Sequence, residues 1–156
     1  MRSEIFDIVG CDQRIGFWRS DVSQHGDIVQ IVTRALSGDL VEYPLPEQKS
    51  ERGGGGLFCS SRNYIQILQD LILPEPKILS KDSLDILFAS QFEDPSPALD
   101  QLRASTPMFS AMTGPLTASL PPSGTNHALG GILVMENSEL GETRGTMAWG
   151  GAYSPL

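Results

Sequence analysis

The chain has 156 residues, enough for one domain with a hydrophobic core. It carries 19 acidic and 11 basic residues, and a formal net charge of −8 argues against a surface for nucleic acid or for an anionic membrane. The two cysteines, Cys11 and Cys59, have neither a metal-site nor a redox-pair spacing, so two free thiols in a reducing compartment are expected, with a disulfide between them left open.

Targeting and cofactor signals are absent from the sequence. The first residues are charged and no apolar core follows them, and no apolar run approaches the roughly 20 residues of a membrane span. The glycines at 53–56 lack the Gly-Lys-Ser/Thr continuation of a phosphate-binding loop. We therefore expect a soluble, cytoplasmic protein without a cofactor or a metal ion.

In chain order, residues 16–25 have mixed polarity and predict a loop, with His25 solvated in it. The β-branched run 28–34 predicts a short strand, and residues 40–44 predict its antiparallel partner across a turn at 37–39. The predicted hairpin ends at the two prolines that follow.

The strongest local prediction is a helix over residues 61–73, capped by Ser60 or Ser61 and ended by Pro74. Its apolar positions recur with helical spacing, so Tyr64 is expected to anchor the helix in the core, together with Leu68, Leu71 and Ile72. The polar positions are expected to face water; they are Asn63, Gln66, Gln69 and Asp70.

The second half predicts a helix that opens at Ser80, with inward Leu84, Leu87 and Phe88, and a short helix over residues 98–104 with Leu99 and Leu102 inward. Proline and glycine predict a loop over 106–125. Two antiparallel strands, 129–135 and 143–148, are then expected across a polar turn.

The last of these strands runs into two glycines, Gly150 and Gly151. Two glycines leave the backbone amides open, so they could bind a ligand oxygen or a developing oxyanion. The same pattern is typical of a β-bulge or a hairpin corner, and local sequence leaves both interpretations open.

Four stretches, taken in order, resemble a known family. They are the run from Ile5 to Gly10, the run from Gly53 to Tyr64, the run from His127 to Met135, which opens with His-Ala-Leu-Gly-Gly, and Trp149-Gly150-Gly151-Ala152. Their order resembles the C-terminal portion of the serine β-lactamase-like family, in its fungal esterase and acyltransferase branch. The resemblance implies an α/β fold of α+β type: an antiparallel sheet with flanking helices, as one incomplete domain over 1–156 that lacks the nucleophile helix and the last strand and helix.

The resemblance also implies roles for particular residues. Residues Trp149, Gly150, Gly151 and Ala152 would line the acyl site, and the Ala152 N–H would serve the oxyanion hole. No serine here has a lysine three residues later, and no tyrosine continues into the family's Tyr-x-Asn or Tyr-x-Ser motif, so no catalytic residue is assigned. His127 is expected to be a hydrogen-bonded structural residue.

The function implied by the resemblance is acyl transfer or ester hydrolysis on a small-molecule acyl substrate, without activity in this chain by itself. The alternatives are a non-catalytic remnant that binds an acyl group or a protein, and a gene product without a function of its own. The acyl donor, the acyl acceptor and the oligomeric state are not readable from the sequence. Uncovered core surface predicts marginal stability.

Overall fold

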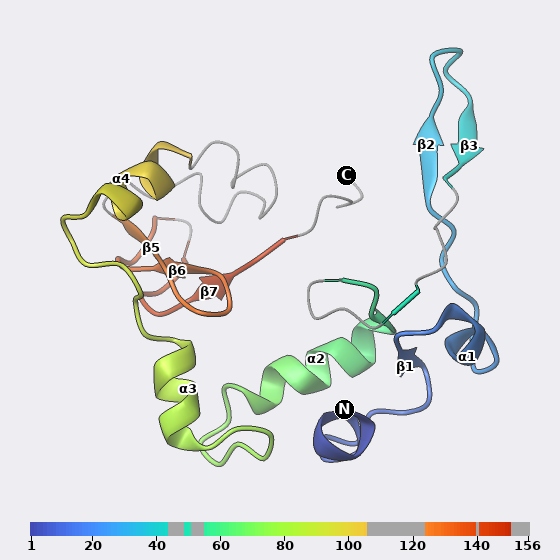
Figure 1. Ribbon diagram of the computed structural model, residues 1–156, viewed down its shortest axis with the longest axis horizontal. Coiled ribbons are helices and arrows are strands. Elements are labelled where there is room, and N and C mark those ends of the chain that lie inside the picture. The colour runs from blue at the N-terminus through green and yellow to red at the C-terminus, as the bar shows by residue number, and fades with distance from the viewer. Residues whose placement is uncertain (44–48, 51–54, 106–123, 140, 151–156) are drawn as a thin grey trace. The chain divides into compact units, whose positions relative to one another are not determined.

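The computed structural model describes residues 1–43, 49–50, 55–105, 124–139 and 141–150. The chain divides into two compact units, Met1–Ser80 and Lys81–Leu156 (Figure 1). Within the described residues no helix is long and apolar enough to cross a membrane. Two parts of the sequence predictions lie outside the described residues. They are most of the predicted loop over 106–125, and Gly151 and Ala152 of the predicted oxyanion site.

The first unit combines short helices with two antiparallel strand pairs. Its elements are the π-helix η1 (Arg2–Phe6), β1 (Ile15–Gly16), α1 (Arg19–Ser23), β2 (Val32–Arg34), β3 (Leu40–Glu42), β4 (Phe58–Cys59) and α2 (Ser61–Asp70). The β2–β3 hairpin is confirmed, although both strands are shorter than predicted. The loop predicted over 16–25 is wrong, because this segment contains helix α1, whose Val22 is buried.

Strands β1 and β4 bring the start of the chain against the entry to α2. Ile15 pairs with Cys59 and Gly16 with Phe58, and the Ser60 N–H donates to the Arg14 carbonyl at 3.2 Å. Close by, Phe6, Cys11 and Ile15 form a buried cluster onto which Ile5, Val9, Leu57 and Ile67 pack. The core of this unit is therefore small and is built mainly from its first 15 residues.

Helix α2 is oriented differently from the prediction. Ser60 caps it by accepting the Asn63 N–H at 3.2 Å, as expected, but Asn63 and Asp70 are buried and the apolar Tyr64 and Leu68 are exposed. The expectation that Asn63 and Asp70 face water, with Tyr64 in the core, is wrong. Backbone hydrogen bonding explains the reversal: both polar side chains satisfy N–H groups of loops that pack on their side of the helix.

Two loops are held in this way. The Asn63 amide donates to the Asp12 carboxylate at 2.9 Å, and its oxygen accepts the Asp12 N–H at 3.2 Å. At the other end of α2, the Asp70 carboxylate accepts the N–H groups of Lys77 and Ile78 at 2.9–3.1 Å. Each buried polar side chain therefore closes a loop onto the helix.

Because the Asp12 carboxylate is hydrogen-bonded in the folded chain, we expect the free energy of unfolding to fall in acid. Hydrogen bonds from the Arg14 side chain and then from Asn63 hold the pKa of Asp12 well below its ordinary value. This lowered pKa stabilises the folded chain above about pH 4, where Asp12 is ionised in the unfolded chain too, and the contribution is lost as pH falls through the folded-state pKa. Urea midpoints measured from about pH 5 down to about pH 2, a range that includes the ordinary aspartate pKa of about 3.9, should fall less steeply in Asp12→Asn than in the wild type. Glu75→Gln, an exposed control, should keep the wild-type slope.

The second unit carries a three-stranded antiparallel sheet. Its elements are α3 (Lys81–Leu87), α4 (Pro97–Ala104), β5 (Thr125–His127), β6 (Ile132–Val134) and β7 (Met147–Ala148), and the strand order is β5–β6–β7. Both helices and the β6–β7 pair were predicted, whereas β5 falls where the sequence predicted the end of a loop. The fold class, α/β with antiparallel sheets and flanking helices, is confirmed.

The central strand β6 supplies three of the six buried apolar residues described in this unit. Its three residues, Ile132, Leu133 and Val134, are all buried, and so are Ala128 and Leu99. Leu99 lies on α4, which begins after Ser96 accepts the Leu99 N–H at 3.3 Å. The predicted inward position of Leu99 is therefore confirmed, and the sheet is held on a well-packed central strand.

Candidate functional site

Strand β7, which leads into Trp149 and Gly150, lies at the edge of the three-stranded sheet. In the register, His127 of β5 is opposite Ile132 of β6, which is in turn opposite Ala148 of β7. Trp149 follows β7 directly, and its ring lies 5.9 Å from the His127 ring at an interplanar angle of 73°, an edge-to-face contact. The two outer strands therefore place a histidine and a half-exposed tryptophan side by side.

Two glycines before β6 allow β7 to approach closely. A Cβ atom on Gly131 would lie 2.6 Å from the carbonyl oxygen of Ala148 and 3.2 Å from the Cβ of Trp149. A Cβ on Gly130 would lie 2.7 Å from the terminal methyl of Met147. The glycine pair, which lies in the connection between β5 and β6 and not in the strand predicted from residue 129, is therefore in close contact with the strand that leads into Trp149 and Gly150.

A loop that precedes α4 forms hydrogen bonds with strand β5 at Asn126 and His127. Asn126 accepts the Phe92 N–H at 3.3 Å and donates to the Phe92 carbonyl at 3.0 Å, and the Gln91 N–H donates to the His127 carbonyl at 2.8 Å. These bonds place the Phe92 ring 6.3 Å from the His127 ring. The His127 ring therefore lies near two aromatic rings, those of Phe92 and Trp149.

Of the four site residues taken from the sequence, the structure describes two. Trp149 is 58% exposed and Gly150 is half-buried, and both lie at the end of β7. Gly151 and Ala152 lie outside the described residues, so the predicted oxyanion-hole N–H stays a prediction. Sequence reasoning missed Asn126 and Phe92; the only signal was an asparagine inside a short strand, where asparagine is uncommon.

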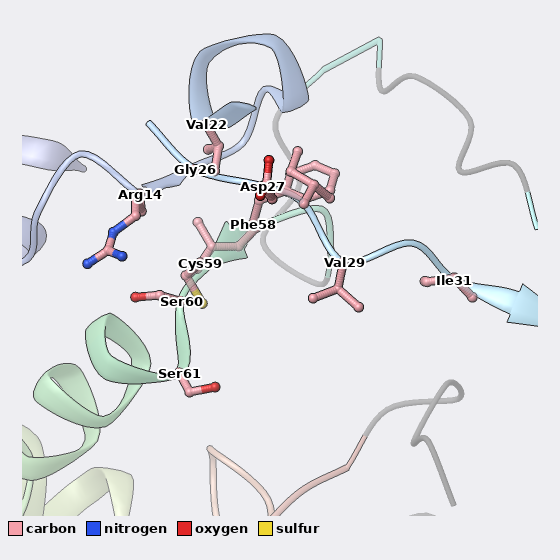
Figure 2. Close-up of a pocket in the computed structure, with 12 residues that line it drawn as sticks. Arg14, Val22, Gly26, Asp27, Val29, Ile31, Phe58, Cys59, Ser60 and Ser61 are labelled. Carbon is pink, nitrogen blue, oxygen red and sulfur yellow. The ribbon is translucent and has the colours of Figure 1, made fainter. Parts of the chain in front are cut away.

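A separate cavity of about 550 Å³ lies in the first unit (Figure 2). Its wall comes from the segment before β1, from α1, from residues 26–31 and from residues 57–61, and most of it is apolar, including Val22, Ile28, Val29, Leu57 and Phe58. Cys59, Ser60 and Ser61 line it where β4 meets α2 (Figure 2). It contains neither Trp149 nor Gly150.

The hydroxyl and thiol groups of this cavity do not form a nucleophile with a base. Ser60 is engaged as the cap of α2, and burial raises the pKa of the Cys59 thiol, which lowers its thiolate fraction. Among the described residues that line the cavity there is no histidine, lysine or tyrosine to accept a proton. The geometry of the described residues therefore assigns no catalytic residue.

Comparison with known proteins shows which fungal enzymes the chain resembles. No protein-family model matches the chain. The acyltransferase calJ of Penicillium decumbens is 32% identical over 105 residues, and ML-236A carboxylate methylbutanoyltransferase mlcH of Penicillium citrinum is 30% identical over 105 residues. These alignments cover 67% and 64% of this chain but 24% and 23% of the relatives, so the chain spans about a quarter of their length.

Solved structures show the same fold. Unliganded simvastatin synthase (LovD) from Aspergillus terreus, as its selenomethionyl derivative, matches 96% of the chain with a TM-score of 0.73 and 21% identity, and the chain covers 37% of it. A mutant of the same synthase matches with a TM-score of 0.71 and 23% identity. The chain is therefore similar in sequence to two fungal enzymes that transfer acyl groups, and its fold corresponds to a part of the fold of the synthase.

Proposed function

We propose that this chain supplies one wall of an acyl-transfer site in a β-lactamase-like acyltransferase, with the backbone after Trp149 forming part of the oxyanion hole. The supporting observation is the close approach of Gly131 to the Ala148 carbonyl group and to the Cβ of Trp149, because it brings two of the four sequence motifs together at one strand edge. In this proposal the residues Trp149, Gly150, Gly151 and Ala152 bind the acyl group, and the Ala152 N–H donates to its carbonyl oxygen.

The chemistry fits a polar backbone donor beside an apolar surface. A carbonyl carbon that is attacked by a nucleophile places negative charge on its oxygen, and a fixed N–H stabilises that charge without having to reorganise. The nucleophile itself would come from the family's Ser-x-x-Lys motif, which this sequence does not contain. The substrate would be a small-molecule acyl group carried as an ester or thioester, handled in the cytoplasm, and no nucleic acid or membrane is involved.

The experiment has two arms. The purified chain should neither hydrolyse p-nitrophenyl butyrate above background nor become labelled by a fluorophosphonate, because its sequence contains no Ser-x-x-Lys motif. A chimera in which this chain replaces the matched segment of calJ should show esterase activity. In the chimera, Ala152→Pro removes the proposed N–H donor and should lower kcat by about 100-fold. The control variant Ala152→Gly keeps the N–H and should retain most of the kcat of the unsubstituted chimera.

Two results would contradict the proposal. A labelled serine in the isolated chain would show that a nucleophile is present after all. Ala152→Pro and Ala152→Gly chimeras with equal activity and equal thermal melts would show that this N–H does not serve the reaction. A chimera that is active but insensitive at position 152 therefore rejects the oxyanion role, while leaving the family relationship intact.

A further inference from the structure

The backbone of His127 is fixed at three points. The residue pairs with Ile132 of β6, its N–H donates to the side-chain oxygen of Asn126 at 2.7 Å, and its carbonyl accepts the Gln91 N–H at 2.8 Å. Asn126 before it is 3% exposed, and Ala128 after it is fully buried. Buried neighbours and paired backbone groups mark the most stable parts of a structure, so His127 belongs to the rigid part of the sheet.

Trp149 has less support from its own strand. Strand β7 lies at the edge of the sheet, consists of two residues and ends at Ala148. The side chain of Trp149 is 58% exposed, and Gly150 after it has no side chain with which to anchor the backbone. A contact between the Trp149 ring and a rigid part of the sheet therefore has a direct effect on the direction of the backbone that follows.

The ring of His127 provides such a contact. Neighbouring strands lie about 4.8 Å apart, so the backbones of β5 and β7 are separated by about 10 Å across β6. The centroids of the His127 and Trp149 rings are nevertheless 5.9 Å apart, so the two rings reach toward each other from the outer strands. Gly131 leaves room for this approach, because a Cβ atom there would lie 3.2 Å from the Cβ of Trp149. The interplanar angle of 73° is the edge-to-face geometry that aromatic pairs prefer.

We propose that His127 is a positioning residue for acyl transfer: its ring keeps the Trp149 ring, and with it the backbone from Gly150 onward, in one orientation. The inference rests on the proposed function, in which this backbone supplies the oxyanion-hole donor. Such a donor is effective only if it already points to the place where the negative charge develops. In this role His127 exchanges no proton, so another aromatic ring can replace it. A second aromatic contact, with Phe92 at 6.3 Å, limits the movement of the imidazole itself.

The first measurement is the mobility of the Trp149 ring in the whole chain, by NMR relaxation of its indole N–H group. The sequence has two tryptophans, and Trp18→Phe identifies the Trp149 signal. Its order parameter should be close to about 0.85, the rigid value, and should fall below about 0.6 in His127→Ala. His127→Phe keeps an aromatic edge and should keep the rigid value. The control Arg144→Ala changes an exposed side chain in the turn before β7 and should leave the order parameter unchanged.

The second measurement is the hydrolysis of p-nitrophenyl butyrate by the calJ chimera. His127→Ala should lower kcat by about three- to tenfold, which is the range that an edge-to-face aromatic pair contributes. KM should stay within about twofold, because the contact orients a donor that acts in the transition state. His127→Phe and Arg144→Ala should each keep kcat within about twofold of the unsubstituted chimera. Circular dichroism melts of the same proteins check that every variant is folded.

Four results would overturn the inference. An unchanged Trp149 order parameter in His127→Ala would show that the ring contact does not hold the indole, and a fall in the order parameter without a fall in kcat would show that the contact does not serve the reaction. An equal loss in His127→Phe would exclude the aromatic edge as the cause, and an equal loss in Arg144→Ala would assign the effect to a general loosening of β7. Equal activity of the Ala152→Pro and Ala152→Gly chimeras would instead reject the proposed function, and the positioning role with it, even where His127→Ala frees the Trp149 ring. The order parameter therefore separates the two failures.

Discussion

Gly131→Ala should lower the free energy of unfolding by about 2–3 kcal/mol, the upper range for an overpacked core position. The added methyl group would lie 2.6 Å from the Ala148 carbonyl oxygen and 3.1 Å from its carbonyl carbon, and backbone atoms cannot move aside as a flexible side chain does. Strand β7 would have to move away from β6, taking Trp149 from the His127 ring. Urea unfolding followed by circular dichroism and by tryptophan fluorescence measures both effects.

Gly130→Ala is the matched control for this prediction. Its added methyl group would meet the terminal methyl and the sulfur of Met147, the far end of a flexible side chain, at 2.7 and 2.9 Å. A new Met147 rotamer relieves this contact, so the loss of stability should stay below about 1 kcal/mol. If the two glycine variants lose equal stability, the close approach of β7 at Gly131 is not the cause.

The sequence predicted elements more reliably than their orientation. The β2–β3 hairpin, the cap of α2 at Ser60 and the inward position of Leu99 follow from turn residues, capping chemistry and local periodicity, all of which act over a few residues. The orientation of α2 depends on Asp12, which lies 51 positions before Asn63. No local pattern contains that pairing, and the apolar periodicity by itself predicted the opposite side of the helix to be buried.

In the candidate site, too, local sequence motifs could be recognised, whereas contacts between distant residues could not. The order of four short motifs led to the family, and the Gly130-Gly131 pair proved to lie against the strand that carries Trp149. The neighbours of His127 could not be predicted, because Phe92 reaches it through hydrogen bonds to Asn126 across 34 positions of chain. Strand β5 was missed because it is only three residues long, Thr125–His127, and its middle residue is an asparagine, which strands seldom contain.

Asn63→Ala should have the second large effect, a loss of about 2 kcal/mol in the free energy of unfolding. Asn63 is 1% exposed, and its side chain both accepts the Asp12 N–H and donates to the Asp12 carboxylate, so alanine removes two hydrogen bonds and leaves a space behind. Gln66→Ala removes one longer, exposed hydrogen bond to Gly10 from the same helix and should cost less than about 0.5 kcal/mol. Urea midpoints for the two variants measure this difference in the free energy of unfolding. Equal losses would mean that the Asn63–Asp12 pair does not fix α2, and the outward orientation of its apolar side would then need another cause.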